Sequence, residues 1–401
     1  DMEILSNRVL QMSESETLAM TRIARELKAQ GKDVISLSIG EPDFNTPDIV
    51  KASAKKAIDD NYTHYPPVPG YADLREAISR KFKRDNNLDY KPEQIVVSTG
   101  AKQSIFQTVM VLINPGDEVI IPTPFWVSYK EIVKVAEAKT IYVKTSLKNN
   151  FKVTPQQLEE AITPKTKLIM FSSPSNPTGM LYTKAELKAI ADVLKKYPHV
   201  YVMADEIYEH INFEGKHESL AQFDYIKDQV ITVNGVAKGF AMTGWRIGFI
   251  GANLKIAKAC DKLQGQVTSA TCSIAQRATI TAMEMDPTTS KDIIDMRNKF
   301  RERRDLMFEL LKDIPNIKVI LPQGAFYFFP EVNYYYGKTY KDYKINNSND
   351  LAMYLLYEAN VALVPGAAFG DDNCIRFSYA TSDNLLIEAV RRIKEALLNL
   401  K

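Results

Sequence analysis

Residues 233–249 read VNGVAKGFAMTGWRIGF, and the apolar runs 230–233 and 247–250 on either side each have the length of a buried strand. The stretch carries one lysine, Lys238, between two glycines, and one arginine, Arg246, eight positions later. A lysine at the end of a buried strand is costly to desolvate unless it is paired or used covalently. A lone lysine between glycines is otherwise typical of an exposed turn. The pattern therefore predicts a strand–loop–strand unit whose loop holds a candidate site.

Apolar, β-branched segments alternate with helical stretches before this unit. The alternation predicts an α/β fold, with a mostly parallel seven-stranded sheet sandwiched by helices. The predicted strands are 95–98, 118–121, 140–144, 168–172, 201–204, 230–233 and 247–251. Sheets of this kind bind ligands at the carboxyl ends of their strands. We therefore expect the side chains that follow these strands to form the site.

The order of the elements predicts two domains. Residues 47–299 form a large domain around the seven strands. Residues 300–401 form a smaller α+β domain, and residues 1–46 form an N-terminal arm that contributes to it. The smaller domain is predicted to contain strands at 317–320, 326–329, 361–364 and 375–378 and a helix at 384–398. Residues 334–349, rich in aromatic residues, Lys and Asn, are predicted to be a surface insertion.

Composition limits the classes of function. The 401 residues are 45% hydrophobic and 25% charged, and a formal net charge of +2 argues against a dedicated nucleic-acid or membrane surface. No apolar segment approaches membrane-spanning length, and the first residues are too polar for a secretory signal. The three cysteines form no paired motif and the four histidines show no metal-ligand spacing. We therefore expect a cytoplasmic protein without a metal site.

A buried lysine beside an arginine suits an aldehyde cofactor that carries a phosphate. The neighbouring cation lowers the pKa of the amine, and the planar guanidinium binds phosphate. Pyridoxal 5′-phosphate is the common cofactor of this kind. It also needs an acid at its ring nitrogen, a donor to its ring hydroxyl, a stacking surface and backbone amides. Gly100 and Ala101 open a helix after a strand and so offer free amides to an anion, whereas no P-loop or GxGxxG motif occurs.

Five side chains each have a functional and a structural interpretation. Asp205 follows an apolar strand, and is either an acid for the ring nitrogen or a helix N-cap. Asn176 either points its amide at the cofactor or belongs to a plain turn. Tyr208 is a core residue unless it reaches the cofactor. Trp126 either stacks on the ring or packs in the core. Arg376 lies inside an apolar strand. It is either a clamp for a substrate carboxylate or half of a structural salt bridge.

Three motifs carry a resemblance to a known family. They are VNGVAKGFAMTGWRIG, SPSNPTG at residues 173–179 and ADEIYEH at residues 204–210. In this order and register they make the chain similar to the class I/II pyridoxal-phosphate aminotransferases, and in particular to the bacterial aspartate aminotransferase subgroup. The resemblance extends from about residue 36 to residue 379.

The resemblance implies roles for the candidate residues. Lys238 forms a Schiff base with pyridoxal 5′-phosphate and then acts as general base and acid, with Asp205 and Tyr208 completing the catalytic set. The implied cofactor-binding residues are Gly100, Ala101, Lys102, Trp126, Asn176, Asp205, Tyr208, Lys238, Arg246 and, from the partner subunit, Tyr65. The enzyme would therefore be a homodimer with shared active sites.

The same resemblance implies the substrate contacts, which are Gly40, Trp126, Asn176, Arg376, Lys102 and Thr17. Arg376 takes the α-carboxylate of an amino acid. Lys102, helped by Thr17 and Ser15, reaches a distal carboxylate, which implies a ping-pong transamination between aspartate and 2-oxoglutarate. Lys102 is alternatively a phosphate ligand or a solvated side chain.

The sequence leaves other functions open. Aromatic amino acids, alanine and prephenate are alternative substrates, and a pyridoxal-phosphate lyase acting at the β or γ carbon would keep the cofactor contacts while changing the substrate contacts. An effector-sensing domain of a transcription factor would need a basic DNA-binding segment ahead of the fold, and residues 1–35 are too short for one. A plain interaction protein would bind no cofactor.

Overall fold

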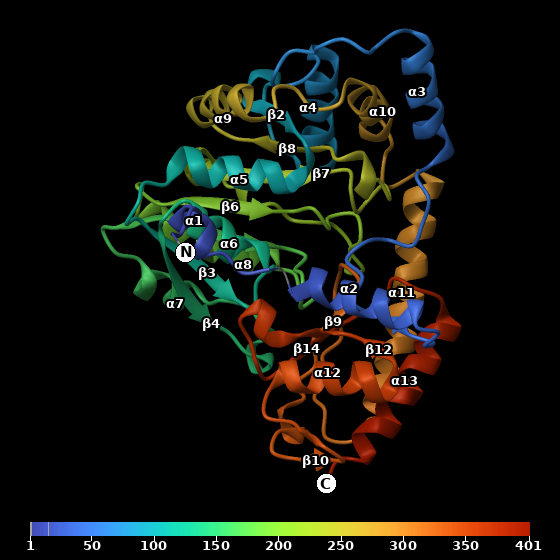
Figure 1. Cartoon of the computed structure of the whole chain (residues 1–401). Helices are drawn as coiled ribbons and strands as arrows, with labels where there is room; N and C mark the ends of the chain where they lie inside the picture. The colour runs from blue at the N-terminus through green and yellow to red at the C-terminus, as the bar shows by residue number, and fades with distance from the viewer. Residues whose placement is uncertain (1, 15) are drawn as a thin grey trace.

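The computed structural model describes residues 2–14 and 16–401. Seven strands form one sheet in the order β2-β8-β7-β6-β5-β3-β4 (Figure 1). They are β2 (Ile95–Ser98), β3 (Glu118–Thr123), β4 (Lys139–Lys144), β5 (Thr166–Ser172), β6 (Tyr201–Asp205), β7 (Val230–Gly235) and β8 (Gly248–Gly251). β8 runs antiparallel to both of its neighbours, and the other pairings are parallel. The predicted fold class is confirmed, and each of the seven predicted strands is present.

Helices cover both faces of this sheet. One face packs against α3 (Asp48–Asp59), α4 (Ala72–Asn86), α7 (Pro155–Ala161), α8 (Lys184–Lys195) and α10 (Ser273–Met283). The other packs against α5 (Gly100–Leu112), α6 (Ser128–Val135) and α9 (Leu254–Val267). Alternate strand residues divide between the faces, so that Ile169 joins the first core and Leu168 the second. Burial on both faces explains why these strands read as continuous apolar runs.

A further core forms in the C-terminal part of the chain. Its strands are β9 (Tyr327–Phe328), β12 (Val361–Ala362), β13 (Val364–Pro365) and β14 (Ile375–Ser378), and its helices are α11 (Lys291–Lys312), α12 (Ser348–Ala359) and α13 (Asp383–Leu398). β13, β14 and β9 form an antiparallel sheet, and β1 (Ile35–Ser36) pairs in parallel with β12. Helix α2 (Glu16–Ala29) packs on the same core, whereas α1 (Asn7–Leu10) lies against α6. The N-terminal segment therefore lies beside elements from the far end of the chain.

Two predictions about this C-terminal part are wrong. Residues 317–320 form no strand, because their recorded sheet contact is an isolated bridge between Lys318 and Glu331. Residues 334–349 are not a surface insertion, because Tyr335 and Ile345 are buried in the C-terminal core. Between them, β10 (Thr339–Tyr340) and β11 (Tyr343–Lys344) form an antiparallel hairpin that packs its tyrosines on that core.

No helix in the described part of the chain combines the length and the apolar character that crossing a membrane requires.

Candidate active site

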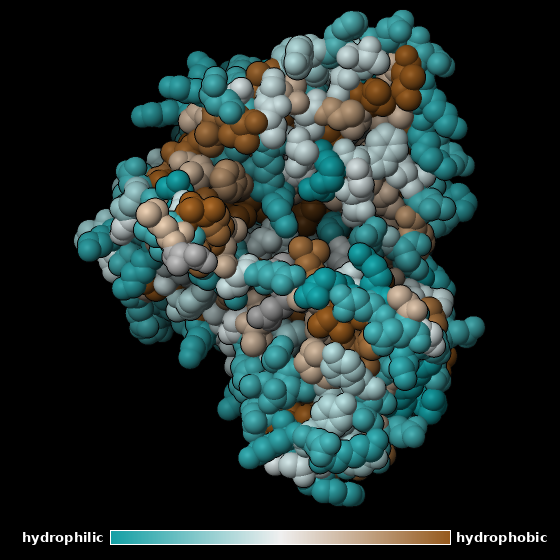
Figure 2. Space-filling model, in the orientation of Figure 1, coloured by the Kyte–Doolittle hydropathy of each residue, from teal (hydrophilic) through white to brown (hydrophobic). Residues whose placement is uncertain are grey.

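A pocket of about 270 Å³ lies where the carboxyl ends of β5, β6 and β7 meet the C-terminal part of the chain. Figure 2 shows the molecule hollowed between these two regions. Most of the predicted site residues line this pocket, namely Gly40, Ala101, Lys102, Trp126, Asn176, Asp205, Tyr208, Lys238, Arg246 and Arg376. They come from segments that are far apart in the sequence, so the topology of the sheet is what brings them together.

Lys238 lies just beyond β7, and its Nζ donates a hydrogen bond to the carbonyl of Gly40. Burial, helped by the positive charges of Arg376 and Arg246, lowers the pKa of Lys238 to about 8. The neutral, nucleophilic form of the amine is therefore much more accessible near neutral pH than it is in a free lysine.

Asp205 ends β6 and is buried, and burial raises its pKa to about 6. The Tyr129 hydroxyl donates to its Oδ2 at 2.5 Å, and the Ile207 amide donates to its Oδ1 at 3.2 Å. No helix begins at this position, because residues 207–210 form a turn. The helix N-cap interpretation of Asp205 is therefore wrong, and its carboxyl group lines the pocket instead.

Arg376, in β14, is 1% exposed. Its guanidinium donates to Asn176 Oδ1 and to the Ser38 carbonyl, each at 2.9 Å, and lies 4.4 Å from the Tyr327 ring centroid. Among the described residues no carboxylate forms an ion pair with it, and its Nε has no hydrogen-bond partner. The salt-bridge interpretation is therefore wrong. A buried cation that lines a pocket without a counter-charge is suited to an anionic ligand.

The opposite end of the pocket is formed by the first turn of α5. Gly100 has a φ of +83°, and a Cβ there would collide with the Arg246 guanidinium, so the two residues are in close contact. Arg246 Nη1 donates to the Thr243 carbonyl at 3.0 Å and is exposed to the pocket. Free amides at a helix N-terminus beside an arginine form an anion site.

Lys102 and Trp126 lie side by side on the pocket wall, with the ammonium 5.0 Å from the centre of the indole. Partial desolvation by the pocket wall and the nearby charge of Arg246 lower the pKa of Lys102, although its side chain stays exposed. On the other side of the pocket the Tyr208 hydroxyl is 2.8 Å from that of Tyr327, and burial raises the pKa of Tyr208 well above its ordinary value. Tyr208 therefore stays a neutral hydrogen-bonding group.

Four predicted residues are not among those that line the pocket. Gly100 is one of them, although it contacts Arg246, which does line the pocket. Tyr65 is 94% exposed and does not line the pocket of its own chain. The Thr17 side chain and Ser15 lie outside the described residues, although Leu18, next in α2, does line the pocket.

Sequence reasoning missed Tyr129 and Tyr327, which contact Asp205, Tyr208 and Arg376. Both tyrosines lie in apolar surroundings, where a tyrosine is usually a core residue. The one available signal was that Tyr129 follows Trp126 by three residues at a helix start.

Known proteins resemble this chain in both sequence and fold. The family model for aminotransferases of class I and II matches residues 32–393. The chain belongs to this family. It is 46% identical over 398 residues to a probable aspartate/prephenate aminotransferase of Rickettsia bellii, covering 98% of this chain and 99% of the relative. It is 45% identical to a bifunctional aspartate and glutamate/aspartate-prephenate aminotransferase of Petunia hybrida, covering 99% of this chain and 83% of the relative.

Solved structures agree with this family membership. The aspartate aminotransferase of Rhizobium meliloti superposes with a TM-score of 0.95 at 40% identity, covering 100% of both chains. The Thermus thermophilus aspartate aminotransferase with maleate gives a TM-score of 0.92 at 38% identity, covering 98% of this chain and 100% of that one. The protein is an aminotransferase, and its cofactor is pyridoxal 5′-phosphate.

The pocket of this aminotransferase fits that cofactor. Lys238 offers an amine with a lowered pKa, and Asp205 offers a buried carboxyl group to a ring nitrogen. The α5 N-terminus with Arg246 offers a phosphate site. These are the donors that the aldehyde, the ring and the phosphate of the cofactor require.

Proposed function

We propose that this aminotransferase transfers the amino group of aspartate to 2-oxoglutarate by a ping-pong mechanism. One observation carries the proposal. Arg376, a buried guanidinium without a carboxylate partner among the described residues, shares a pocket with the amine of Lys238 and the acid of Asp205. An α-amino acid supplies the carboxylate that Arg376 lacks and presents its amine to the catalytic centre.

Lys238 acts first as the attachment point and then as the proton carrier. Bound pyridoxal phosphate supplies an aldehyde that condenses with amines and a ring that draws electrons from the α-carbon. Lys238 Nζ is the amine that would hold the cofactor covalently. When it is not attached to the cofactor, the same amine would serve as the base that takes the α-proton and as the acid that gives it back. A pKa of about 8 suits a group that must act as base and then as acid.

The remaining pocket residues orient and polarise the cofactor. Asp205, as a carboxylate, keeps the ring nitrogen protonated, and Tyr208 donates to the ring oxygen. Asn176 also donates to the ring oxygen, because Arg376 already occupies its amide oxygen and leaves the amide nitrogen free to donate. Trp126 stacks on the ring. The phosphate is held by Gly100, Ala101 and Arg246.

Aspartate is the preferred substrate because Lys102 places a second cation on the pocket wall. It would pair with the distal carboxylate, while Gly40 and Trp126 border the substrate. Prephenate is a second candidate acceptor. Two relatives carry prephenate in their names, and Leu18, Ile105 and Val127 give the pocket an apolar wall for a carbon ring.

We also propose a cytoplasmic homodimer with shared sites. Tyr65 is too exposed to serve its own pocket, and it would reach the phosphate of the neighbouring subunit. The cysteines are free thiols, as a reducing compartment allows. We propose domain boundaries near residues 46 and 299, with α11 spanning the second one.

The deciding experiment is a half-reaction. Protein loaded with pyridoxal phosphate receives aspartate alone, and we expect one equivalent of oxaloacetate with conversion of the cofactor spectrum to the pyridoxamine form. Adding 2-oxoglutarate should then give continuous turnover and glutamate. Release of pyruvate and ammonia without an acceptor would instead identify a lyase. Conversion by phenylalanine or alanine but not by aspartate would identify a different substrate class.

A further inference from the structure

Tyr129 is a buried side chain in the first turn of α6, and it is 1% exposed. Its hydroxyl donates to Asp205 Oδ2 at 2.5 Å, across a sequence separation of 76 residues. Its ring meets the Trp126 ring edge-on, with centroids 5.6 Å apart and planes at 90°. One side chain therefore contacts two of the groups that face the cofactor, one through its hydroxyl and the other through its ring.

Asp205 depends on neutral donors for its stabilisation. Among the described residues it forms no ion pair within 4.0 Å, and its recorded hydrogen bonds come from Tyr129 and from the Ile207 amide. The charged groups that act on it from farther away are Glu206, next in the chain, and Lys238, beyond β7. These two have opposite effects on its ionisation. Tyr129 is therefore the strongest single group that favours the carboxylate.

We propose that Tyr129 is a positioning residue, whose hydroxyl keeps the Asp205 carboxylate ionised and oriented toward the pocket while its ring supports Trp126. This inference rests on the proposed role of Asp205 as the partner of the ring nitrogen. If Asp205 were protonated, it would no longer hold a proton on that nitrogen, and the ring would lose its capacity to accept electrons. Tyr129 therefore acts on the reaction through Asp205 and does not touch the cofactor.

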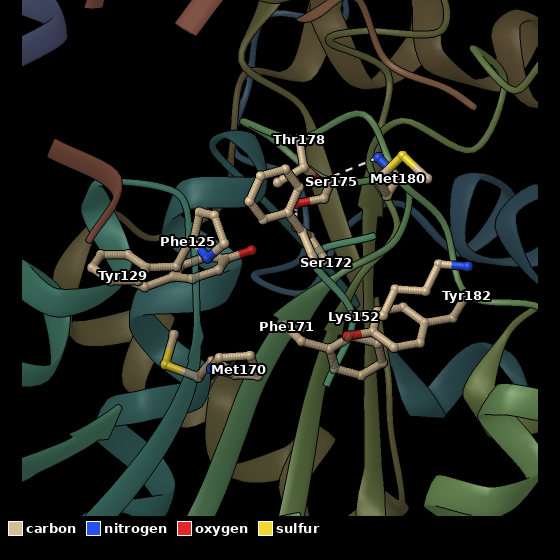
Figure 3. Close-up of a pocket in the computed structure, with 13 residues that line it drawn as sticks. Phe125, Tyr129, Lys152, Met170, Phe171, Ser172, Ser175, Thr178, Met180 and Tyr182 are labelled. Carbon is tan, nitrogen blue, oxygen red and sulfur yellow. Dashed lines mark hydrogen bonds between the residues drawn. The ribbon is translucent and has the colours of Figure 1, made fainter. Parts of the chain in front are cut away.

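A matched control lies on the same side of the molecule. Tyr129 and Tyr182 both line a cavity of about 20 Å³ behind the pocket, which is room for about one water molecule. Figure 3 shows Phe125 and Tyr129 on one side of this cavity and Lys152 and Tyr182 on the other. The Tyr182 hydroxyl accepts a hydrogen bond from the Val153 amide at 2.9 Å. Tyr182→Phe therefore deletes a buried hydroxyl that does not contact Asp205.

The first test is a pH titration of Asp205 in the full-length protein without cofactor. Infrared difference spectroscopy follows the carboxyl band, and Asp205→Asn identifies it. Tyr129→Phe keeps the ring and removes one hydrogen bond to a charged group, so the pKa of Asp205 should rise by about one to two pH units. Tyr182→Phe should leave it unchanged. An unchanged midpoint in Tyr129→Phe, or an equal rise in Tyr182→Phe, would overturn the proposal.

The second test is the affinity for pyridoxal 5′-phosphate, measured by titration at two pH values. Tyr129→Phe should weaken binding by about two- to tenfold at pH 7, where a rise of one to two pH units leaves Asp205 largely protonated. The deficit should shrink at pH 9, where the carboxylate is ionised again. A deficit of the same size at both pH values would show a packing defect and overturn the proposal. Failure of the unmodified protein to bind the cofactor would refute the proposed function instead, and the infrared result would still stand.

Discussion

Replacing Arg376 by methionine should greatly reduce catalysis while leaving the stability of the fold almost unchanged. Methionine preserves much of the apolar volume against the Tyr327 and Phe369 rings and removes the charge. A substrate α-carboxylate paired with this buried guanidinium contributes about 3–4 kcal/mol, which is the usual cost of breaking such a pair. We therefore expect kcat/KM for aspartate to fall by roughly 10²- to 10³-fold.

The free energy of unfolding should change far less. The substitution loses the hydrogen bonds to Asn176 and Ser38, about 1.5–3 kcal/mol each for a charged donor. It also removes the desolvation cost of a buried, unpaired cation, which is several kcal/mol. The two effects nearly cancel, so we expect a melting temperature within a few degrees of the parent.

Arg303→Met provides the contrasting control. Arg303 is also buried, but its guanidinium forms a two-pronged ion pair with Asp43 at 2.7 and 2.8 Å. Breaking this pair should lower the free energy of unfolding by about 3 kcal/mol. Thermal denaturation with and without maleate completes the assay. Maleate at a hundredfold excess over its Kd should stabilise the parent by about 2.7 kcal/mol and should not stabilise Arg376→Met. Unaltered kcat/KM, or a loss of stability in Arg376→Met that equals that of Arg303→Met, would refute the reasoning.

Four further predictions concern the pocket and the dimer. Lys238→Met should leave no cofactor fixed to the protein by borohydride, and trapping on another lysine would contradict its assignment. Burial lowers the pKa of Lys238 from 10.5 to about 8, so below pH 8 the folded protein carries a costly buried charge. Cofactor-free Lys238→Met should therefore be more stable than the parent at pH 7, by at most about 3 kcal/mol, and this advantage should vanish as the pH rises from about 8 to 10.5. Lys102→Met should reduce kcat/KM about tenfold or more for aspartate and little for alanine, whereas equal losses would indicate a phosphate contact. Tyr65→Ala and Lys238→Ala should each be weakly active or inactive, yet mixed dimers should regain activity because one of their two sites has both residues. No recovery on mixing would contradict shared sites.

The sheet could be predicted from the sequence because it is buried on both faces. A strand such as β5 then reads as an uninterrupted apolar run, and the helices between strands are long enough to recognise. The C-terminal part lacks this clarity, because β9, β12 and β13 are two residues long and depend on tertiary contacts. The start of helix α12 could have been predicted, because the Asn347 side chain accepts a hydrogen bond from the Asp350 amide as an N-cap. The aromatic residues just before it made the segment look like an irregular insertion instead.

In the site, the residues that could be predicted are those whose burial is chemically costly. An arginine in an apolar strand and an acid at a strand end need a reason for their position, so Arg376 and Asp205 stand out. Tyr129 needs no such reason, because a tyrosine packs well in a core and its partner is 76 residues away. The Gly40 carbonyl is equally invisible, because a backbone contact leaves no trace in residue type.

The charges of the pocket predict which substrate features are strictly required. Four cations and one carboxylate are among its described lining residues, namely Lys102, Lys238, Arg246, Arg376 and Asp205. This positive excess suits a pocket that must hold a phosphate and two carboxylates. The two ends of the substrate are not equally constrained, however, because Arg376 is buried whereas Lys102 is exposed. Leaving a buried cation unpaired is costly and leaving an exposed one unpaired costs little. The pocket should therefore demand an α-carboxylate of every substrate, favour a distal carboxylate, and still accept side chains that lack one.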